Sequence, residues 1–98
     1  AYCFKEILFM DFEFDPAKSE SNKDKHGIDF VEARALWLDE KRLVVPLETT
    51  SEERYIMIAQ LRGKCWSAVY TYRNDRLRVI SVRRSRDKEK QRYEDHQR

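Results

Sequence analysis

The chain has 98 residues, of which 41% are hydrophobic and 12% aromatic, enough to build the core of one small domain. Charged residues make up 39%, so most positions outside the core are ionic. No apolar run is long enough for a membrane span or a secretory signal. Cys3 and Cys65 are too few for a disulfide framework or a metal cluster. The sequence therefore predicts a single cytoplasmic domain over residues 1–98, without a cofactor, metal or membrane anchor.

Positive charge is concentrated near the C-terminus. Residues 1–72 hold 10 Lys and Arg against 13 Asp and Glu, a balance of −3, whereas residues 73–98 hold 10 against 5, a balance of +5. A concentrated cationic surface suits an extended polyanion as partner. The alternative is a solvated helix face with i,i+4 ion pairs.

The N-terminal part is predicted to lead into a polar helix. Residues 1–11 are interpreted as an N-terminal extension or an edge strand, with Met10 as an alternative initiator. Asp15 and Pro16 are typical of a helix start, since Asp caps the first turn and Pro suits the first helical position. Gly27 suits the position after the last residue of this helix.

A second helix is predicted to follow at once. Asp29 and Glu32 have the spacing of a capping box, and the helix is expected to end near 39–40. Apolar residues recur behind the box at helical spacing: Phe30, Ala33, Leu36 and Trp37.

From residue 43 the apolar period becomes two, which indicates strands. The first, Leu43–Val45, is expected to stop at Pro46, with a loop over Glu48–Glu53. The following strands are predicted over 55–61, 65–72 and 76–82, joined by turns at 62–64 and at Asn74-Asp75.

Ser85 can cap a closing helix that runs through Tyr93. The predicted fold is therefore α+β: two N-terminal helices, an antiparallel meander and a C-terminal helix, with the helices on one sheet face and the other face free for a ligand.

Two groups of side chains are candidates for chemistry. His26 ends a helix that has little to bury, and its reference pKa near 6.5 suits a general acid or base, although a lone histidine is more often structural. Arginines line the last strand, and guanidinium groups clamp phosphates in two-point contacts; the alternative is a merely charged open face. These arginines are Arg73, Arg76, Arg78, Arg83 and Arg84.

Aromatic rings are interleaved with these cations, as in sheets that stack the bases of single-stranded RNA. Tyr70, Tyr72 and Tyr93 are the candidates, with Trp66 nearby in the sequence. The favoured alternative is that Trp66 and Tyr70 belong to the core and only one tyrosine is exposed. Glycine phosphate loops, GxSxG and metal-ligand spacings are absent, which argues against nucleotide hydrolases, α/β-hydrolases and zinc enzymes.

Several motifs occur together in the chain, namely FEFDPAKxxxNxxKHGIDFxEA (12–33), Glu53-Arg54, Val69-Tyr70-Thr71 and RLRVISVRR (76–84), with Glu89 and Tyr93-Glu94. They resemble the BrnT family of type II ribonuclease toxins, which are related in fold to RelE. The resemblance covers roughly residues 12–94. It implies a RelE-like, metal-independent endoribonuclease that inhibits translation and growth. Its implied partner is a ribbon-helix-helix antitoxin (BrnA-like), whose complex with the toxin binds DNA and represses the shared operon.

The resemblance implies that RNA is cut by attack of its own 2′-OH, leaving a 2′,3′-cyclic phosphate and a 5′-OH. The residues expected to carry out catalysis are His26 as acid or base, Lys25, Arg54 and Arg83 as clamps, and Glu53 as an orienting group. Those expected to bind RNA are Arg73, Arg76, Arg78, Arg84, Thr71, Ser81 and Tyr93. The alternative is a non-catalytic nucleic-acid- or protein-binding module that uses the same cationic sheet; an inert scaffold explains the clustered arginines poorly.

Overall fold

A computed structural model describes residues 11–48 and 52–97. Residues 1–10 of the expected extension, which include Cys3 and the candidate initiator Met10, lie outside the described residues, as does the middle of the 48–53 loop. The elements in chain order are β1 (Phe12–Glu13), α2 (Pro16–His26), α3 (Phe30–Ala33), the 3₁₀ helix η1 (Arg34–Leu38), β2 (Leu43–Leu47), β3 (Arg54–Leu61), β4 (Lys64–Arg73), β5 (Arg76–Arg84) and α4 (Asp87–His96).

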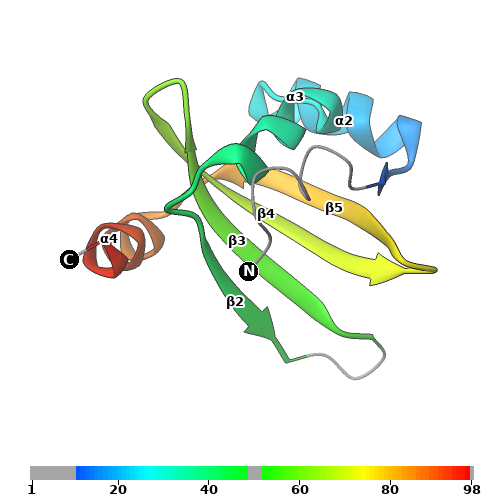
Figure 1. The fold of residues 1–98 in the computed structure, drawn as a ribbon. Coiled ribbons are helices and arrows are strands. Elements are labelled where there is room, and N and C mark those ends of the chain that lie inside the picture. The colour runs from blue at the N-terminus through cyan, green and yellow to red at the C-terminus, as the bar shows by residue number, and fades with distance from the viewer. Residues whose placement is uncertain (1–10, 49–51, 98) are drawn as a thin grey trace.

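The described strands form one sheet in the order β1-β5-β4-β3-β2 (Figure 1). Strands β2 to β5 are antiparallel neighbours, as the meander prediction required, and β1 adds a short parallel pairing to β5. The β4–β5 turn places both Asn74 and Asp75 at positive φ, 53° and 63°, as two-residue hairpin turns of this kind require. The α+β class is therefore confirmed.

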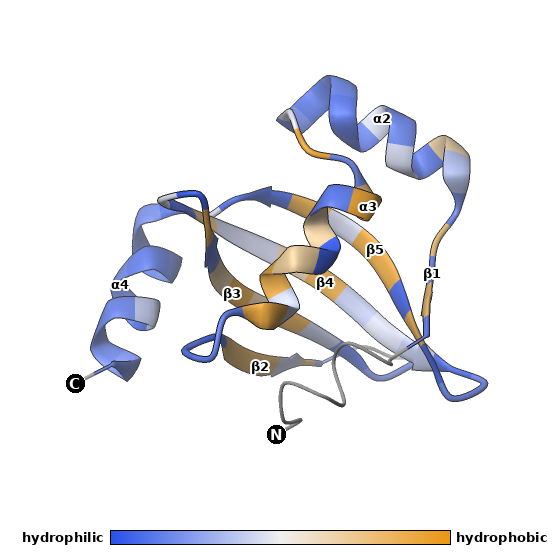
Figure 2. Ribbon diagram, turned by 45° about the horizontal axis from the view of Figure 1, so that its top comes forward, coloured by the Kyte–Doolittle hydropathy of each residue, from blue (hydrophilic) through white to orange (hydrophobic). Residues whose placement is uncertain are grey.

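The two faces of the sheet differ in character. One face, called the core face, carries Met57, Ala68 and Val79, which are buried together with apolar residues of α3 and η1. The opposite face, called the arginine face, carries Arg54 and its cross-strand neighbours. Figure 2 shows α3 lying over the sheet, whose strands carry orange, hydrophobic stretches.

A register shift in β5 decides which face its last residues use. Val69 pairs with Ser81 but Tyr70 pairs with Val79, so Ile80 is an extra residue opposite the Val69/Tyr70 step. A bulge of this kind reverses the alternation of side chains beyond it. As a result Arg83 lies on the arginine face, and Arg84 lies on the core face.

Helix α2 has the predicted ends. The side chain of Asp15 accepts a hydrogen bond from the backbone N–H of Ala17 at 2.9 Å, and Gly27 adopts φ +80° and donates to the carbonyl of Lys23. Its buried residues are polar, Ser19 and Asn22. The helix is therefore attached through hydrogen bonds more than through apolar burial.

The second predicted helix is wrong in form. Its capping box is present, with Glu32 N–H to Asp29 at 2.7 Å and Asp29 N–H to Glu32 at 3.1 Å. After four residues, however, the α-helix tightens into the 3₁₀ helix η1. Three residues per turn stack Ala33 directly below Leu36, and both side chains are fully buried. Packing onto the sheet therefore decides the helix type here.

Two further expectations need correction at strand β2 and helix α4. Strand β2 continues through Pro46, which pairs with Tyr55; an edge strand tolerates proline because one side of it makes no ladder bonds. Helix α4 lies on the arginine face instead of joining the other helices, because Tyr93 packs with Ile58 and Cys65. The free face is therefore covered at one end.

Candidate nucleic-acid interface and catalytic groups

Four arginines gather on the arginine face at the end of the sheet where β4 turns into β5. Arg54, Thr71 and Arg78 are cross-strand neighbours in one row, and Arg73 pairs with Arg76 in the next. Arg54, Arg73, Arg76 and Arg78 are called the arginine cluster below.

Two carboxylates partly offset this charge. Glu52 contacts Arg54 at 3.1 Å and Arg73 at 3.5 Å. Glu13, brought in by β1, lies 3.4 Å from Arg78 and 3.9 Å from Arg76. The Glu52–Arg54 pair has an ordinary hydrogen-bond length and the other three pairs are long. Partly exposed pairs contribute little stability, and two carboxylates leave four guanidinium groups with an excess of positive charge.

Arg83 belongs to a second group, beneath α4. Its Nη1 and Nη2 donate to the two carboxylate oxygens of Glu89 at 2.7 and 2.8 Å. Ser67 donates to the same carboxylate at 3.1 Å, and the backbone N–H of Arg86 does so at 2.8 Å. Residue 86 is thus the N-cap position of α4, whereas Ser85, the expected cap, bonds the Ser67 hydroxyl.

The hydrogen bonds from Arg83 are the main reason that the pKa of Glu89 falls from 4.5 to about 2. The same contact raises the pKa of Arg83 above its ordinary value. The two hydrogen bonds to Glu89 hold the guanidinium of Arg83 in one orientation, and 27% of its side chain is exposed. The group is therefore pre-organised for an anion that displaces or joins the carboxylate.

The side chains of Lys25 and His26 are exposed at the C-terminal end of α2 and make no hydrogen bond or ion pair within 11–48 and 52–97. Asn22 fixes where this end lies: its side-chain amide donates to the carbonyl of Val82 at 2.8 Å and accepts from the Val82 N–H at 3.2 Å. Residue 82 immediately precedes Arg83, so the structure places the end of α2 towards the Arg83 end of β5.

Arg54 and Glu53 are not part of that arrangement. From Thr71, opposite Arg54, to Ser67, opposite Arg83, is four residues along β4, or about 13 Å at roughly 3.3 Å per residue. The carboxylate of Glu53 accepts from the Tyr55 hydroxyl at 3.1 Å. Glu52, which precedes Glu53 in the sequence and was not among the predicted site residues, is the partner of Arg54 instead.

Several predicted RNA contacts are occupied by other interactions. Tyr93 is 5% exposed and its hydroxyl donates to Asp39 at 2.6 Å, so it cannot stack on a base in this structure and the prediction for it is wrong. Burial is the main reason its pKa rises to about 12. Thr71 is buried and donates to the carbonyl of Glu53. Ser81 remains partly accessible on the arginine face.

Arg84 sits apart from the other arginines, with its guanidinium 5.5 Å from the ring centroid of Trp66 on the core face. A pocket of about 160 Å³ beside it is lined by Gly27, Arg62, Lys64 and Trp66, among others. Arg62 and Lys64, from the β3–β4 turn, thus lie beside the end of α2. Residue spacing along the chain does not predict this core-face group of Arg62, Lys64 and Arg84.

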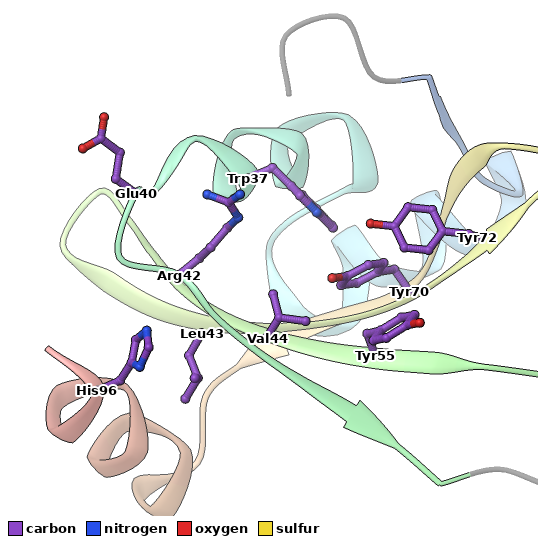
Figure 3. A pocket seen from close by; sticks show the side chains of 9 residues that line it. All are labelled: Trp37, Glu40, Arg42, Leu43, Val44, Tyr55, Tyr70, Tyr72 and His96. Atoms are coloured by element: carbon purple, nitrogen blue, oxygen red, sulfur yellow. The ribbon is translucent and has the colours of Figure 1, made fainter. Parts of the chain in front are cut away.

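The aromatic residues divide as the favoured alternative expected. Trp66 and Tyr70 are buried, and Tyr72 is 41% exposed. A larger pocket of about 500 Å³ lies on the core face beside them (Figure 3). Sequence reasoning missed this pocket, because Trp37 and Arg42 reach it from another part of the chain.

No group of three or more His, Cys, Asp or Glu side chains suited to a metal occurs within 11–48 and 52–97. Among those same residues, none of the helices is long and apolar enough to span a membrane.

The family model for the BrnT ribonuclease toxin of type II toxin–antitoxin systems matches residues 14–89. The chain belongs to this BrnT toxin family. The match includes α2, the whole sheet apart from β1, and Glu89. The arginine cluster, Arg83 and the core-face group therefore all fall within it. Family membership implies an RNA substrate and an antitoxin partner. No curated protein matches the chain closely enough to add to this assignment.

Proposed function

We propose that this BrnT family member is a metal-independent endoribonuclease with a RelE-like fold, which cleaves cytoplasmic RNA and so inhibits translation and growth. The family match supports ribonuclease activity, and the arginine face supports binding of a polyanion. The chain's own cations, with the 2′-OH of the RNA, supply the chemistry in this proposal.

The observation that carries the proposal is the pairing of Arg73 with Arg76. They are direct partners across the β4–β5 hairpin, and like charges opposite one another destabilise a sheet. Among residues 11–48 and 52–97, the carboxylates that pair with them lie at 3.5 and 3.9 Å, too far for strong pairs. An arrangement that costs stability is explained if phosphate groups of RNA complete it.

The proposed reaction is an internal transfer at phosphorus. A base takes the proton of the 2′-OH, whose oxygen attacks the adjacent phosphorus, and the P–O5′ bond breaks as an acid donates a proton to the leaving 5′ oxygen. The products are a 2′,3′-cyclic phosphate and a 5′-OH, and no water is consumed. Cations are needed because negative charge accumulates on the phosphate oxygens.

We assign the reacting phosphate to the edge of β5 at its Arg83 end. Arg83 lies on the arginine face, whereas α2 ends beside the core-face residue Trp66, so the proposal requires the RNA backbone to cross this edge to meet His26 and Lys25. His26 serves as acid or base, a role typically contributing about 10²–10⁴-fold, while Arg83 and Lys25 hold the phosphate. Arg54 lies too far along the sheet for the same phosphate. We therefore place it with the arginine cluster, binding neighbouring nucleotides, with Glu52 rather than Glu53 beside its guanidinium.

The test is the single-turnover rate on a labelled RNA for the parent chain and three variants. We expect Arg83→Ala and His26→Ala to slow cleavage by about 10²-fold or more with modest loss of binding. Arg54→Ala should mainly weaken binding. His96→Ala, which removes the other histidine, is the matched control. If Arg54→Ala abolishes the chemical step and Arg83→Ala does not, the reacting phosphate lies at the arginine cluster instead.

The antitoxin is proposed to be a ribbon-helix-helix protein that covers the arginine face with acidic side chains and binds operator DNA together with the toxin. Blocking of the RNA site is the simplest inhibition. Cross-linking from Arg78→Cys should capture the antitoxin, and cross-linking from an exposed cysteine introduced at Lys18 in α2 should not. The reverse pattern would contradict masking of this face.

A further inference from the structure

The pocket of about 500 Å³ on the core face is lined largely by aromatic rings. Tyr55 and Tyr70 are stacked, with centroids 5.5 Å apart and planes 28° apart, and Tyr72 meets both edge-on at 5.9 Å. Trp37 contacts Tyr70 edge-on at 5.3 Å. In Figure 3 the three tyrosines are grouped together, Trp37 points towards them, and Glu40 and His96 lie apart from them.

This pocket is next to the arginine cluster although it opens on the other face. Tyr55 follows Arg54 on β3, and Tyr72 precedes Arg73 on β4. Successive strand residues point to opposite faces, so each of these neighbouring strands presents an arginine to one face and a tyrosine to the other. Both pairs lie at the same end of the sheet.

We propose that this aromatic pocket binds one nucleobase of an RNA strand whose backbone lies on the arginine cluster. The inference rests on the proposed function, since it takes RNA as the substrate. Aromatic faces stack any base, and the volume falls within the range of about 300–1,000 Å³ typical of small-ligand sites. Arg42, which reaches the rim of the pocket and donates to the Asp39 carbonyl at 3.2 Å, adds a cation there.

Tyr72 is the ring best placed to take the base, because it is 41% exposed while Tyr70 is buried. Its exposure also makes it a safe position to vary. The RNA strand thus wraps around the end of the sheet, with phosphate contacts on the arginine face and a stacking contact on the core face. The stacked base would be turned away from the reacting phosphate.

The experiment measures binding of a short 2′-O-methyl RNA, which lacks the attacking 2′-OH and cannot be cleaved, and of the same oligonucleotide with abasic positions. For the parent chain, removal of the bases should weaken binding about tenfold. Tyr72→Ala should weaken binding of the intact RNA by a similar factor and leave the abasic RNA unchanged. Tyr72→Phe should retain binding, whereas Tyr72→Leu, apolar but not aromatic, should weaken binding about as much as Tyr72→Ala does.

Salt dependence separates stacking from charge. Tyr72→Ala should leave the slope of log affinity against log salt unchanged, whereas Arg73→Ala should reduce it by about 0.7. Competition by a mononucleotide tests whether a free nucleotide suffices; we expect it to compete only weakly. If Tyr72→Ala weakens the binding of intact and abasic RNA equally, or changes the binding of neither, the base pocket is refuted while the ribonuclease proposal stands. Failure of the parent to bind any RNA refutes both.

Discussion

Replacing Glu89 by Gln tests how Arg83 is held. The carboxylate binds both guanidinium Nη atoms of Arg83 at 2.7 and 2.8 Å and also accepts from Ser67 and from the Arg86 backbone. Glutamine keeps the shape but has no charge and one acceptor oxygen. The change therefore leaves Arg83, which is 27% exposed, without its counter-ion.

The pKa of Glu89 gives the size of the effect. A fall from 4.5 to about 2, at about 1.4 kcal/mol per pKa unit, corresponds to roughly 3 kcal/mol. Because the folded-state pKa is depressed, this stabilisation is fully present above the unfolded value near 4.5. It is lost as the pH falls through about 2 and the carboxylate is protonated in both states.

The assay is urea unfolding of the parent and Glu89→Gln at pH 7, 5, 4, 3 and 2. We expect the variant to lose about 2–3 kcal/mol of unfolding free energy at pH 7 and the difference to shrink to below about 1 kcal/mol near pH 2. Glu94→Gln, exposed on the same helix, is the matched control and should follow the parent. A difference between parent and Glu89→Gln that does not change with pH would refute the reasoning.

Three further predictions concern stability. Tyr93→Phe should remove a loss of stability that the parent shows between about pH 10 and 12. The raised pKa of Tyr93 contributes stability that is fully present below the unfolded value of 10 and is lost as the pH rises through about 12; alkaline thermal melts measure it, and identical melts would contradict it. Asn22→Ala leaves the N–H and C=O of Val82 without their partner and should lower the free energy of unfolding in urea by about 2–3 kcal/mol. An unchanged free energy of unfolding would mean that water replaces the amide. Gly27→Ala, at φ +80°, should cost about 1 kcal/mol, and an unchanged midpoint would show that the helix end relaxes.

Local signals predicted the parts of this fold that depend on neighbouring residues. The Asp15-Pro16 start, the Gly27 end, the capping box and the Asn74-Asp75 turn each carry their own stereochemistry, and all four form as predicted. The continuation of β2 through Pro46 was not predicted. A strand tolerates proline only at the edge of a sheet, and the residues around Pro46 do not show that this strand is an edge strand.

The site was predicted less completely, for a physical reason. The bulge at Ile80 reverses the alternation of side chains along β5. A strictly alternating strand would put Arg78 and Arg83 on opposite faces, whereas both lie on the arginine face. The placement of α4 on that face brings Glu89 to Arg83 and buries Tyr93. Both features arise from packing between elements, which the spacing of residues along the chain does not report.

The proposal that the chain cuts RNA through the RNA's own 2′-OH is tested most directly by the ends of its products. A labelled RNA would be incubated with the chain in EDTA, with Arg83→Ala and, as a matched control, Arg92→Ala on the exposed side of α4. We expect fragments ending in 2′,3′-cyclic phosphate and 5′-OH from the parent and the control, and none from Arg83→Ala. RNA that is bound but left intact by the parent, or fragments ending in 3′-OH and 5′-phosphate, would contradict the proposal.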